Sequence, residues 1–521
     1  MNQPVFHYGI DKLTIGIAEK ISLGLIRGIL NEKAIQQIQD CAKHVQEMVD
    51  FKAPVYGVNT GLGQLCDVSI PPKDILILQN KILQSHASGI GNPIPTQVSK
   101  LMLITKVHSL AMGFSGVSLE TIERIIWHID EDLIPVVPEK GSVGASGDLS
   151  PLSHLFLPLI GLGQIHFHDK IVESQTVLHE KGVQSLSLGP KEALGLINGT
   201  QFILAFSVLA LIRFHHLLEI ADIAGALSIE GLMGSKSPFD PRIHALRPYK
   251  GTVWVAKKLY YLLDGSEINH SHINCERVQD PYSMRCIPQV HGASRNAWLH
   301  LRETTEIELN SITDNPLIFS ARDSISGGNF HGQPMAMPLD YATLAAAELG
   351  NISDRRSYLL TEGRYGLPKL LVQNPGLNSG LMIPQYTSAA LVSENKNLCF
   401  PASADSIPTS LGQEDHVSMG SISARKIHQV LDNLEYILAI ELLYSTQSLD
   451  FRRPLKSTPI LESIHSQIRE KVPFIEEDRI FAKDINAIQK LIQEGTLLNT
   501  LEKIIQDQKI NFPIHEEFRI Y

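Results

Sequence analysis

The chain has 521 residues, of which 43% are hydrophobic and 19% are charged. This composition excludes a disordered protein, and the length suits roughly two to four domains. A formal net charge of −10 argues against a nucleic acid or an anionic membrane as partner. Five cysteines without a CxxC pair predict a reducing, cytoplasmic location. Residues 1–15 lack a basic segment followed by an apolar core, so we expect no secretory signal.

Hydrophobic periodicity predicts several long helices. Ser118 is the expected N-cap of a helix that carries apolar residues at helical spacing and must stop near Pro135. Residues 202–232 are apolar on nearly every face, which indicates a helix surrounded by protein. Two further helices are expected at residues 340–362 and 423–449.

Strand signals are sparse, apart from a small hairpin expected over residues 163–174. The sequence therefore predicts a mainly α fold with a long central helical bundle. We expect an N-terminal domain over residues 1–200, the central bundle over residues 201–450 and a C-terminal helical subdomain over residues 451–521.

Residues 193–212 carry no formal charge and are numerous enough to span a bilayer. Polar residues 198–201 interrupt this stretch, and charged residues such as Arg213 and Glu219 follow on the same apparent helix. We therefore predict a buried helix of a soluble protein, with no membrane partner.

The most informative segment is a glycine-rich loop that reads EKGSVGASGDLSPLSH from residue 139 to residue 154. It is not a P-loop, because no Gly-Lys-Ser/Thr follows, and its glycines are spaced by three, which excludes G-x-G-x-x-G. It is not a G-x-S-x-G elbow either, because Asp148 stands at the place of the last glycine. The simplest interpretation is a flexible turn before a helix.

Residues 145–147, Ala145-Ser146-Gly147, allow a chemical interpretation. In a sharply bent backbone the Gly147 nitrogen can attack the Ala145 carbonyl and close a five-membered ring, since glycine tolerates such a conformation. Loss of one water from the ring and of the Ser146 hydroxyl as a second water leaves a methylidene group conjugated to an imidazolone. The product is a strong electrophile made from the chain itself.

This loop resembles the 4-methylidene-imidazol-5-one (MIO) signature of the aromatic amino-acid ammonia-lyases. The resemblance extends in the same order from about residue 50 to residue 450. Its further motifs are YGVNTGLG at 56–63, LQN at 78–80 through SHASG at 85–89, NGTQ at 198–201, YSMRCIPQ at 282–289, DNP at 314–316, GGNFHG at 327–332 and QEDHVSM at 413–419.

The resemblance implies the fold and the partners as well as the chemistry. It implies the fumarase/aspartase-like architecture of the ammonia-lyases and a homotetramer whose sites are built by more than one subunit. MIO would replace an external cofactor as the electron sink for removal of an amine. No metal is expected, because His166 and His168 lack an obvious third ligand and an exposed turn explains them better.

The resemblance also assigns roles to individual side chains. Tyr56 would be the base that takes the β-proton, although a packed loop aromatic is its simplest interpretation. Arg285 would bind the substrate carboxylate through its bidentate guanidinium, with a surface ion pair as its alternative. Tyr282, three residues earlier on the same side of a helical turn, would line the site as a hydrogen-bond donor or proton carrier. Asn198 would hold the MIO carbonyl and the substrate carboxylate, while a helix-entry cap is the alternative.

Three more residues receive weaker assignments. Gln279 is expected at the substrate, and Phe330 is expected as an apolar wall, with ordinary core as its alternative. Asp148 supports ring closure or fixes the loop, and an N-cap role is equally open.

Selectivity should depend on the groups that face the substrate side chain, which are Ser85, His86 and Glu414. An imidazole donates and accepts hydrogen bonds and suits such an ionisable pair, whereas a phenyl ring would leave the charge unpaired. Glu414 and the residues after it resemble the histidine-specific branch of the family. The implied reaction converts L-histidine to trans-urocanate and ammonia, with a catalytic role for Glu414.

Other functions stay open at this point. A tyrosine or phenylalanine ammonia-lyase, or an aminomutase of the same family, would share everything except the neighbourhood of Ser85, His86 and Glu414. A helical scaffold whose loop never cyclises is the alternative that is not an enzyme. Two departures from the histidine-specific pattern, Leu62 and Ser150, affect loop packing only.

Overall fold

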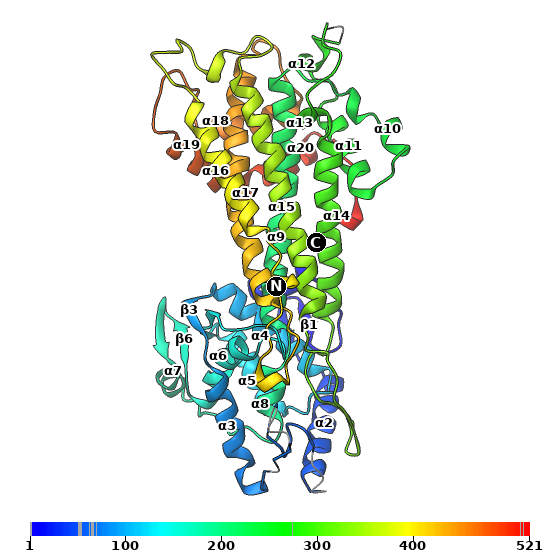
Figure 1. Ribbon diagram of the computed structural model, residues 1–521, viewed down its shortest axis with the longest axis vertical. Coiled ribbons are helices and arrows are strands. Elements are labelled where there is room, and N and C mark those ends of the chain that lie inside the picture. The colour runs from blue at the N-terminus through cyan, green and yellow to red at the C-terminus, as the bar shows by residue number, and fades with distance from the viewer. Residues whose placement is uncertain are drawn as a thin grey trace.

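A computed structural model describes residues 3–50, 55–61, 63, 67–68, 70–273, 275–510, 512–513 and 515–521; Leu62 and Cys66 lie outside these ranges. Long helices form an upright bundle above a smaller part that contains the N-terminal elements (Figure 1). The longest helices of the bundle pack side by side. They are α9 (Gln201–Gly231), α14 (Ile287–Leu309), α15 (Gln333–Thr361) and α17 (Gly420–Asp450). The prediction of a mainly α fold is confirmed.

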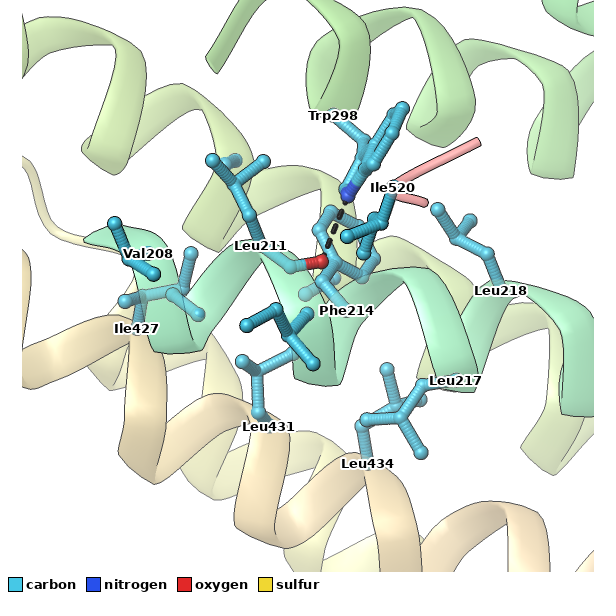
Figure 2. Close-up of a cluster of buried hydrophobic side chains, with 14 of the residues drawn as sticks. Val208, Leu211, Phe214, Leu217, Leu218, Trp298, Ile427, Leu431, Leu434 and Ile520 are labelled. Carbon is cyan, nitrogen blue, oxygen red and sulfur yellow. Dashed lines mark hydrogen bonds between the residues drawn. The ribbon is translucent and has the colours of Figure 1, made fainter. Parts of the chain in front are cut away.

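Helix α9 lies at the centre of the bundle because its apolar side chains point in all directions. In Figure 2, Leu211 and Phe214 of α9 lie between Trp298 of α14 and Leu431 of α17. The Trp298 indole N–H donates to the Leu211 carbonyl at 2.9 Å, which satisfies the polar atom of this buried ring. By length and composition α9 could cross a membrane, but 72% of its most apolar stretch is buried inside the protein.

The predicted bounds of the bundle helices hold within a few residues, except at the start of α15. That helix begins at Gln333, seven residues before the expected start, and includes Pro338. Pro334 is compatible with the first helical turn, whereas Pro338 lies inside the helix and has no N–H to donate to the carbonyl four residues before it.

Shorter helices surround the bundle and build the smaller part. In the N-terminal part they are α1 (Ile15–Ser22), α2 (Glu32–Asp50), α3 (Ile75–His86), α4 (Thr96–Ala111), α5 (Leu119–Asp130), α6 (Leu149–Phe156), α7 (Ser174–Glu180) and α8 (Glu192–Ile197). Beside the bundle they are α10 (Pro241–Ala245), α11 (Lys250–Leu262), α12 (Glu267–His270), α13 (Tyr282–Arg285) and α16 (Met382–Leu398). After residue 450 they are α18 (Pro459–Arg469), α19 (Phe481–Gln493) and α20 (Thr496–Asp507). The domain limits at residues 200 and 450 stay predictions.

Short strands form small sheets. Strand β1 (Val5–His7) pairs in parallel with β2 (Arg27–Ile29). Antiparallel pairs join β3 (Ile90–Pro93) with β5 (Pro138–Lys140) and β8 (Leu317–Ser320) with β9 (Asp323–Ile325). Strand β6 (Gln164–Phe167) lies between β4 (Ile134–Pro135) and β7 (Lys170–Glu173) and is antiparallel to both. The predicted hairpin is confirmed as β6 (Gln164–Phe167) and β7 (Lys170–Glu173), with left-handed residues at its turn. The other strands were missed because two to four residues carry too little periodicity.

One local prediction, the N-cap of α5, can be checked directly. The Ser118 hydroxyl accepts the Thr121 N–H at 3.3 Å, so the predicted N-cap of α5 is confirmed. Helix α4 precedes α5, packs against both α5 and α9, and is buried along almost its whole length. It therefore forms the support behind the loop of residues 142–148.

Candidate active site

The loop of residues 142–148 bends sharply where α6, α9 and α17 begin. Gly144 and Gly147 have φ angles of 69° and 74°, in the left-handed region that favours glycine. A Cβ atom on Gly147 would lie 2.2 Å from the Gly199 carbonyl oxygen, and the two glycines form a parallel bridge. No side chain fits at position 147 without displacing this backbone.

Asp148 joins the loop to the start of α9. Its N–H donates to the Gly199 carbonyl at 2.7 Å, and its carboxylate accepts the N–H groups of Phe202 and Ile203 at 3.1 and 3.0 Å. The carboxylate also accepts the Ser142 hydroxyl at 3.0 Å. Burial raises the pKa of Asp148 to about 7, although these hydrogen bonds lower it. Asp148 therefore caps α9, which is 54 residues away in sequence, and makes no side-chain cap on α6 directly after it.

The first turn of α17 holds the loop from the other side. Ser421 Oγ donates to the Ser142 carbonyl at 2.6 Å, the Met419 N–H to the carbonyl of residue 143 at 2.9 Å, and Ser418 Oγ to the Gly144 carbonyl at 3.2 Å. Consecutive carbonyls of the loop are thus each fixed by α17.

Ser146 lies between Asn198 and Glu414. Its hydroxyl donates to one Glu414 carboxylate oxygen at 2.8 Å, and the Thr409 hydroxyl donates to the other at 2.8 Å. The Asn198 amide nitrogen donates to the Ser146 carbonyl at 2.8 Å. Asn198 Oδ1 is buried and makes no hydrogen bond with any described residue, so this amide has acceptor capacity left for a ligand.

A cavity of about 1080 Å³ opens beside Ser146. Among the residues predicted for the site, it is lined by Tyr56, His86, Ala145, Ser146, Asn198, Phe330 and Glu414. These side chains come from distant parts of the sequence, and the structure brings them together around the loop. Gly147 and Asp148 lie behind the cavity wall, where they shape the loop.

Two of the lining residues have hydrogen bonds that define how they face a ligand. The Gly63 N–H donates to the Tyr56 hydroxyl oxygen at 3.3 Å. His86 Nδ1 lies 2.9 Å from the Ile82 carbonyl oxygen and 3.1 Å from the Ser85 hydroxyl. Nδ1 is therefore engaged within α3, and Nε2 is the ring nitrogen left to face a ligand.

Gln279, Tyr282 and Arg285 do not lie at this cavity within one chain. They are found at the far end of the bundle, around α13 (Figure 1). Tyr282 is 72% exposed, and Gln279 and Arg285 line a separate hollow. The predicted helical turn is confirmed, because the Arg285 guanidinium lies 4.6 Å from the Tyr282 ring centre. The expectation that these three residues share a site with Ser146 is therefore not met by a single chain.

Three polar residues to which the sequence motifs assigned no role lie at or behind the loop. His331 and His416 line the cavity with stacked rings whose centres are 5.5 Å apart. Both lie inside quoted motifs, so position within a motif could have identified them. Lys106, fully buried behind Asn198, is the one charge in an apolar helical stretch, which was also a readable signal.

The histidines considered for metal binding occupy ordinary structural positions. His166 and His168 belong to the hairpin of β6 and β7, and His215 Nε2 lies 2.7 Å from the Phe518 carbonyl. Within the described part of the chain, no three or more His, Cys, Asp or Glu side chains gather as a metal site would require.

The fold and this loop correspond to a known class of enzyme. The aromatic amino acid lyase family matches residues 13–470 of the chain. The chain therefore belongs to the aromatic amino acid lyase family, and the resemblance found in its motifs is confirmed.

The proteins similar to this chain include histidine ammonia-lyases and a tyrosine aminomutase. The histidine ammonia-lyase of Vibrio cholerae serotype O1 is 46% identical over 467 residues, which cover 89% of this chain and 91% of that protein. The histidine ammonia-lyase of Natranaerobius thermophilus is 44% identical, covering 92% and 95%. Among solved structures, histidine ammonia-lyase from Trypanosoma cruzi is 39% identical with a TM-score of 0.89, covering 99% and 97%. Tyrosine aminomutase from Streptomyces globisporus is 33% identical with a TM-score of 0.91, covering 96% and 98%.

Proposed function

We propose that this chain converts L-histidine to trans-urocanate and ammonia, as a carbon–nitrogen lyase of histidine degradation. The observation that carries the proposal is the placement of Glu414 and His86 in one cavity with Ser146. A carboxylate and an imidazole match a substrate ring that donates and accepts hydrogen bonds. Relatives named histidine ammonia-lyase, at 44–46% identity, support the same substrate.

The electrophile in this proposal is MIO, formed from Ala145, Ser146 and Gly147 without an external cofactor. Bond formation between the Gly147 nitrogen and the Ala145 carbonyl carbon releases one water, and loss of the Ser146 hydroxyl with its α-hydrogen releases a second. The surroundings fit such a ring, because position 147 has no room for a side chain and Asn198 already holds the Ser146 carbonyl. When formed, the group supplies a double bond that accepts electrons into this carbonyl.

The chain's own residues bind and orient the substrate and move its proton. The Tyr56 oxygen, with the Gly63 N–H as its donor, takes the β-proton of the substrate. Glu414 and His86 hold the imidazole ring, and Phe330 covers the substrate from the apolar side. The loop carbonyls held by Asn198 and by residues 418–421, together with the Asp148 carboxylate held by α9, keep the site rigid while these groups react.

In this proposal the enzyme is a cytoplasmic homotetramer, and Gln279, Tyr282 and Arg285 reach the cavity of another subunit. Their position at the far end of the bundle, away from the cavity of their own chain, supports shared sites. Exposed apolar residues along α15 and α16, among them Tyr341, Leu344 and Tyr386, support burial of this face between subunits. Cysteines 41, 275, 286 and 399 are free thiols, which supports a reducing compartment.

The test is to incubate the purified enzyme with L-histidine, L-tyrosine and L-phenylalanine in parallel and to follow the absorbance of each unsaturated product. We expect turnover of histidine at a rate well above the other two. Turnover of tyrosine but not histidine would contradict the substrate assignment. The intact mass should be lower than the sequence mass by two waters, whereas the full mass would indicate an uncyclised scaffold.

An aminomutase is the second candidate, because solved tyrosine aminomutases share the fold at 32–33% identity. An aminomutase returns the amine to the β-carbon, so it yields a β-amino acid without net release of ammonia. Chromatography of the products and an ammonia assay in the same reaction separate the two activities. We expect one ammonia for each urocanate and no β-amino acid.

A further inference from the structure

Three lysines are almost completely buried in the described part of the chain: Lys106, Lys191 and Lys258. The Lys191 ammonium pairs with Asp314 at 2.9 Å, and the Lys258 ammonium pairs with two carboxylates of α9 at 2.5 and 3.2 Å. Lys106, on α4, forms no ion pair with any residue that the structure describes. A buried ammonium without a counter-ion is unfavourable, so the position of Lys106 calls for another explanation.

The Lys106 side chain ends at the backbone of the NGTQ motif. Its Nζ donates to the Asn198 carbonyl at 2.6 Å and lies 3.5 Å from the Gln201 side-chain oxygen. The Gln201 amide in turn donates to the Thr313 hydroxyl at 3.0 Å. The amine therefore anchors the turn before α9 to α4, on the side away from the loop.

On its other side, the same turn forms two hydrogen bonds with the loop. The Asn198 side-chain amide donates to the Ser146 carbonyl at 2.8 Å, and the carbonyl of the next residue, Gly199, accepts the Asp148 N–H at 2.7 Å. Gly199 has a φ angle of 135°, in the region that favours glycine. The Asn198 carbonyl that Lys106 holds therefore lies in the same turn as both groups that touch the loop.

We propose that Lys106 is a positioning residue for the reaction: by fixing the Asn198 carbonyl, it aims the Asn198 amide at the Ser146 carbonyl and keeps the loop in the geometry of ring closure. The inference rests on the proposed function and adds a residue of α4 that does not touch the cavity. A methionine of similar length would fill the same space without the penalty of a buried charge. The contribution of the amine is therefore its hydrogen bond and not its volume.

The electrostatics of the position agree with this geometry. Burial lowers the pKa of Lys106 to about 7, and the neighbouring Lys191 acts in the same direction, while Asp314 and Asp148 act against it. An ion-paired lysine would keep its proton more firmly. Burial of the Lys106 amine therefore lowers the free energy of unfolding, as expected for a group whose role is to position the loop.

The test compares Lys106→Met with Lys258→Met, a matched loss of a buried lysine far from the loop. Both variants are purified as the full chain, and folding is followed by circular dichroism and thermal melting. The readouts are the fraction of chains that have lost two waters, by intact mass, and kcat and KM for L-histidine. Lys106→Gln, which keeps an N–H donor, is measured in parallel in case the methionine variant does not fold.

For Lys106→Met we expect incomplete loss of the two waters. We also expect kcat per dehydrated chain to fall by about 10²-fold, since a displacement of about 1 Å at a reacting group has an effect of this size. KM should stay within about twofold, because Glu414 and His86, which hold the imidazole ring, are untouched. Lys106→Gln should lie between Lys106→Met and the wild type.

Lys258→Met should melt earlier, since it leaves buried carboxylates unpaired, yet its folded chains should show the full loss of two waters and the wild-type kcat. Complete dehydration with wild-type kcat in a folded Lys106 variant would overturn the inference. An activity loss that only follows the folded fraction, as for Lys258→Met, would overturn it as well. An unmodified mass in the wild type would instead contradict the proposed function, so the two failures are distinguishable.

Discussion

The loop of residues 142–148 and the segment of residues 279–285 differ in how completely one chain builds them. In the loop, the carbonyls of residues 142, 143, 144 and 146 all accept hydrogen bonds from α17 or from Asn198. In the segment, Gln279 is exposed and Tyr282 is 72% exposed. A group that is assembled from the backbone needs rigid support within its own chain. Side chains that only bind a substrate can arrive with a second subunit.

Loss of the Ser146 hydroxyl should reduce turnover more than any other change to the loop or to residues 279–285. Ser146→Ala cannot release the second water, so we expect turnover to fall by at least about 10³-fold, a modest part of a typical enzymatic rate enhancement. Intact mass measures the loss of water, and the absorbance assay with L-histidine measures turnover. Ser150→Ala, three residues from Gly147, is the control and should keep the loss of two waters and the turnover. Substantial activity of Ser146→Ala would contradict the electrophile assigned to this loop.

Substitution of Glu414 tests whether the carboxylate in the cavity is needed for turnover of histidine. Glu414→Gln keeps the shape but loses the negative charge, and we expect histidine turnover to fall by about 10²–10³-fold, as for loss of an acid–base group. Asp405→Asn, an exposed carboxylate on the same connecting segment, is the control. Rates of Glu414→Gln close to those of the wild type would remove its assigned role.

Arg285 tests whether the two regions meet across subunits. Arg285→Ala should raise KM by about 10–100-fold, because a charge-assisted pair with the substrate carboxylate is lost. Co-expression of Arg285→Ala with Ser146→Ala should restore activity, since mixed oligomers contain sites with an intact loop and an intact arginine.

The control for this experiment is co-expression of Ser146→Ala with Glu414→Gln. Both residues line the cavity of the same chain, so no mixed site is intact and no activity should return. Restoration in the control, or none in the test pair, would show that the segment and the loop do not share sites in the proposed way.

The smallest expected effect is a pH dependence of stability at Lys106. Its pKa is about 7 in the folded chain and about 10.5 when unfolded, so between these values the unfolded state binds more protons. The free energy of unfolding should therefore rise with pH, by about 2 kcal/mol from about pH 7.5 to about pH 9.5 relative to Lys106→Met. Urea unfolding of both proteins at each pH measures this difference, and parallel curves would contradict the lowered pKa.

Much of the bundle could be predicted, because α9 and α17 carry apolar residues at regular spacing over many turns. The early start of α15 could not, because its prolines at positions 334 and 338 look like a break. The motifs identified the residues around the cavity, but they could not separate Arg285 from Ser146. Both residues lie in equally distinctive sequence motifs, and only the packing of the helices places them at opposite ends of the bundle.

Asp148 and Lys106 illustrate the same limit at the level of single contacts. A cap on the adjacent helix α6 was the natural expectation for Asp148, yet its carboxylate caps α9. Lys106 reaches Asn198 across 92 residues of sequence, and no local pattern encodes such a pair.

The sequence by itself determined the capacity for the chemistry, because ring closure requires three adjacent residues, Ala145, Ser146 and Gly147, with no bulky side chain at the last. Helix periodicity determined the bundle for the same reason, since both depend on neighbours along the chain. Only the tertiary structure decided which groups hold the loop, which residues share its cavity and which lie at the far end. These contacts join segments 52 to 279 residues apart, and their geometry follows from how the helices pack and not from any local pattern.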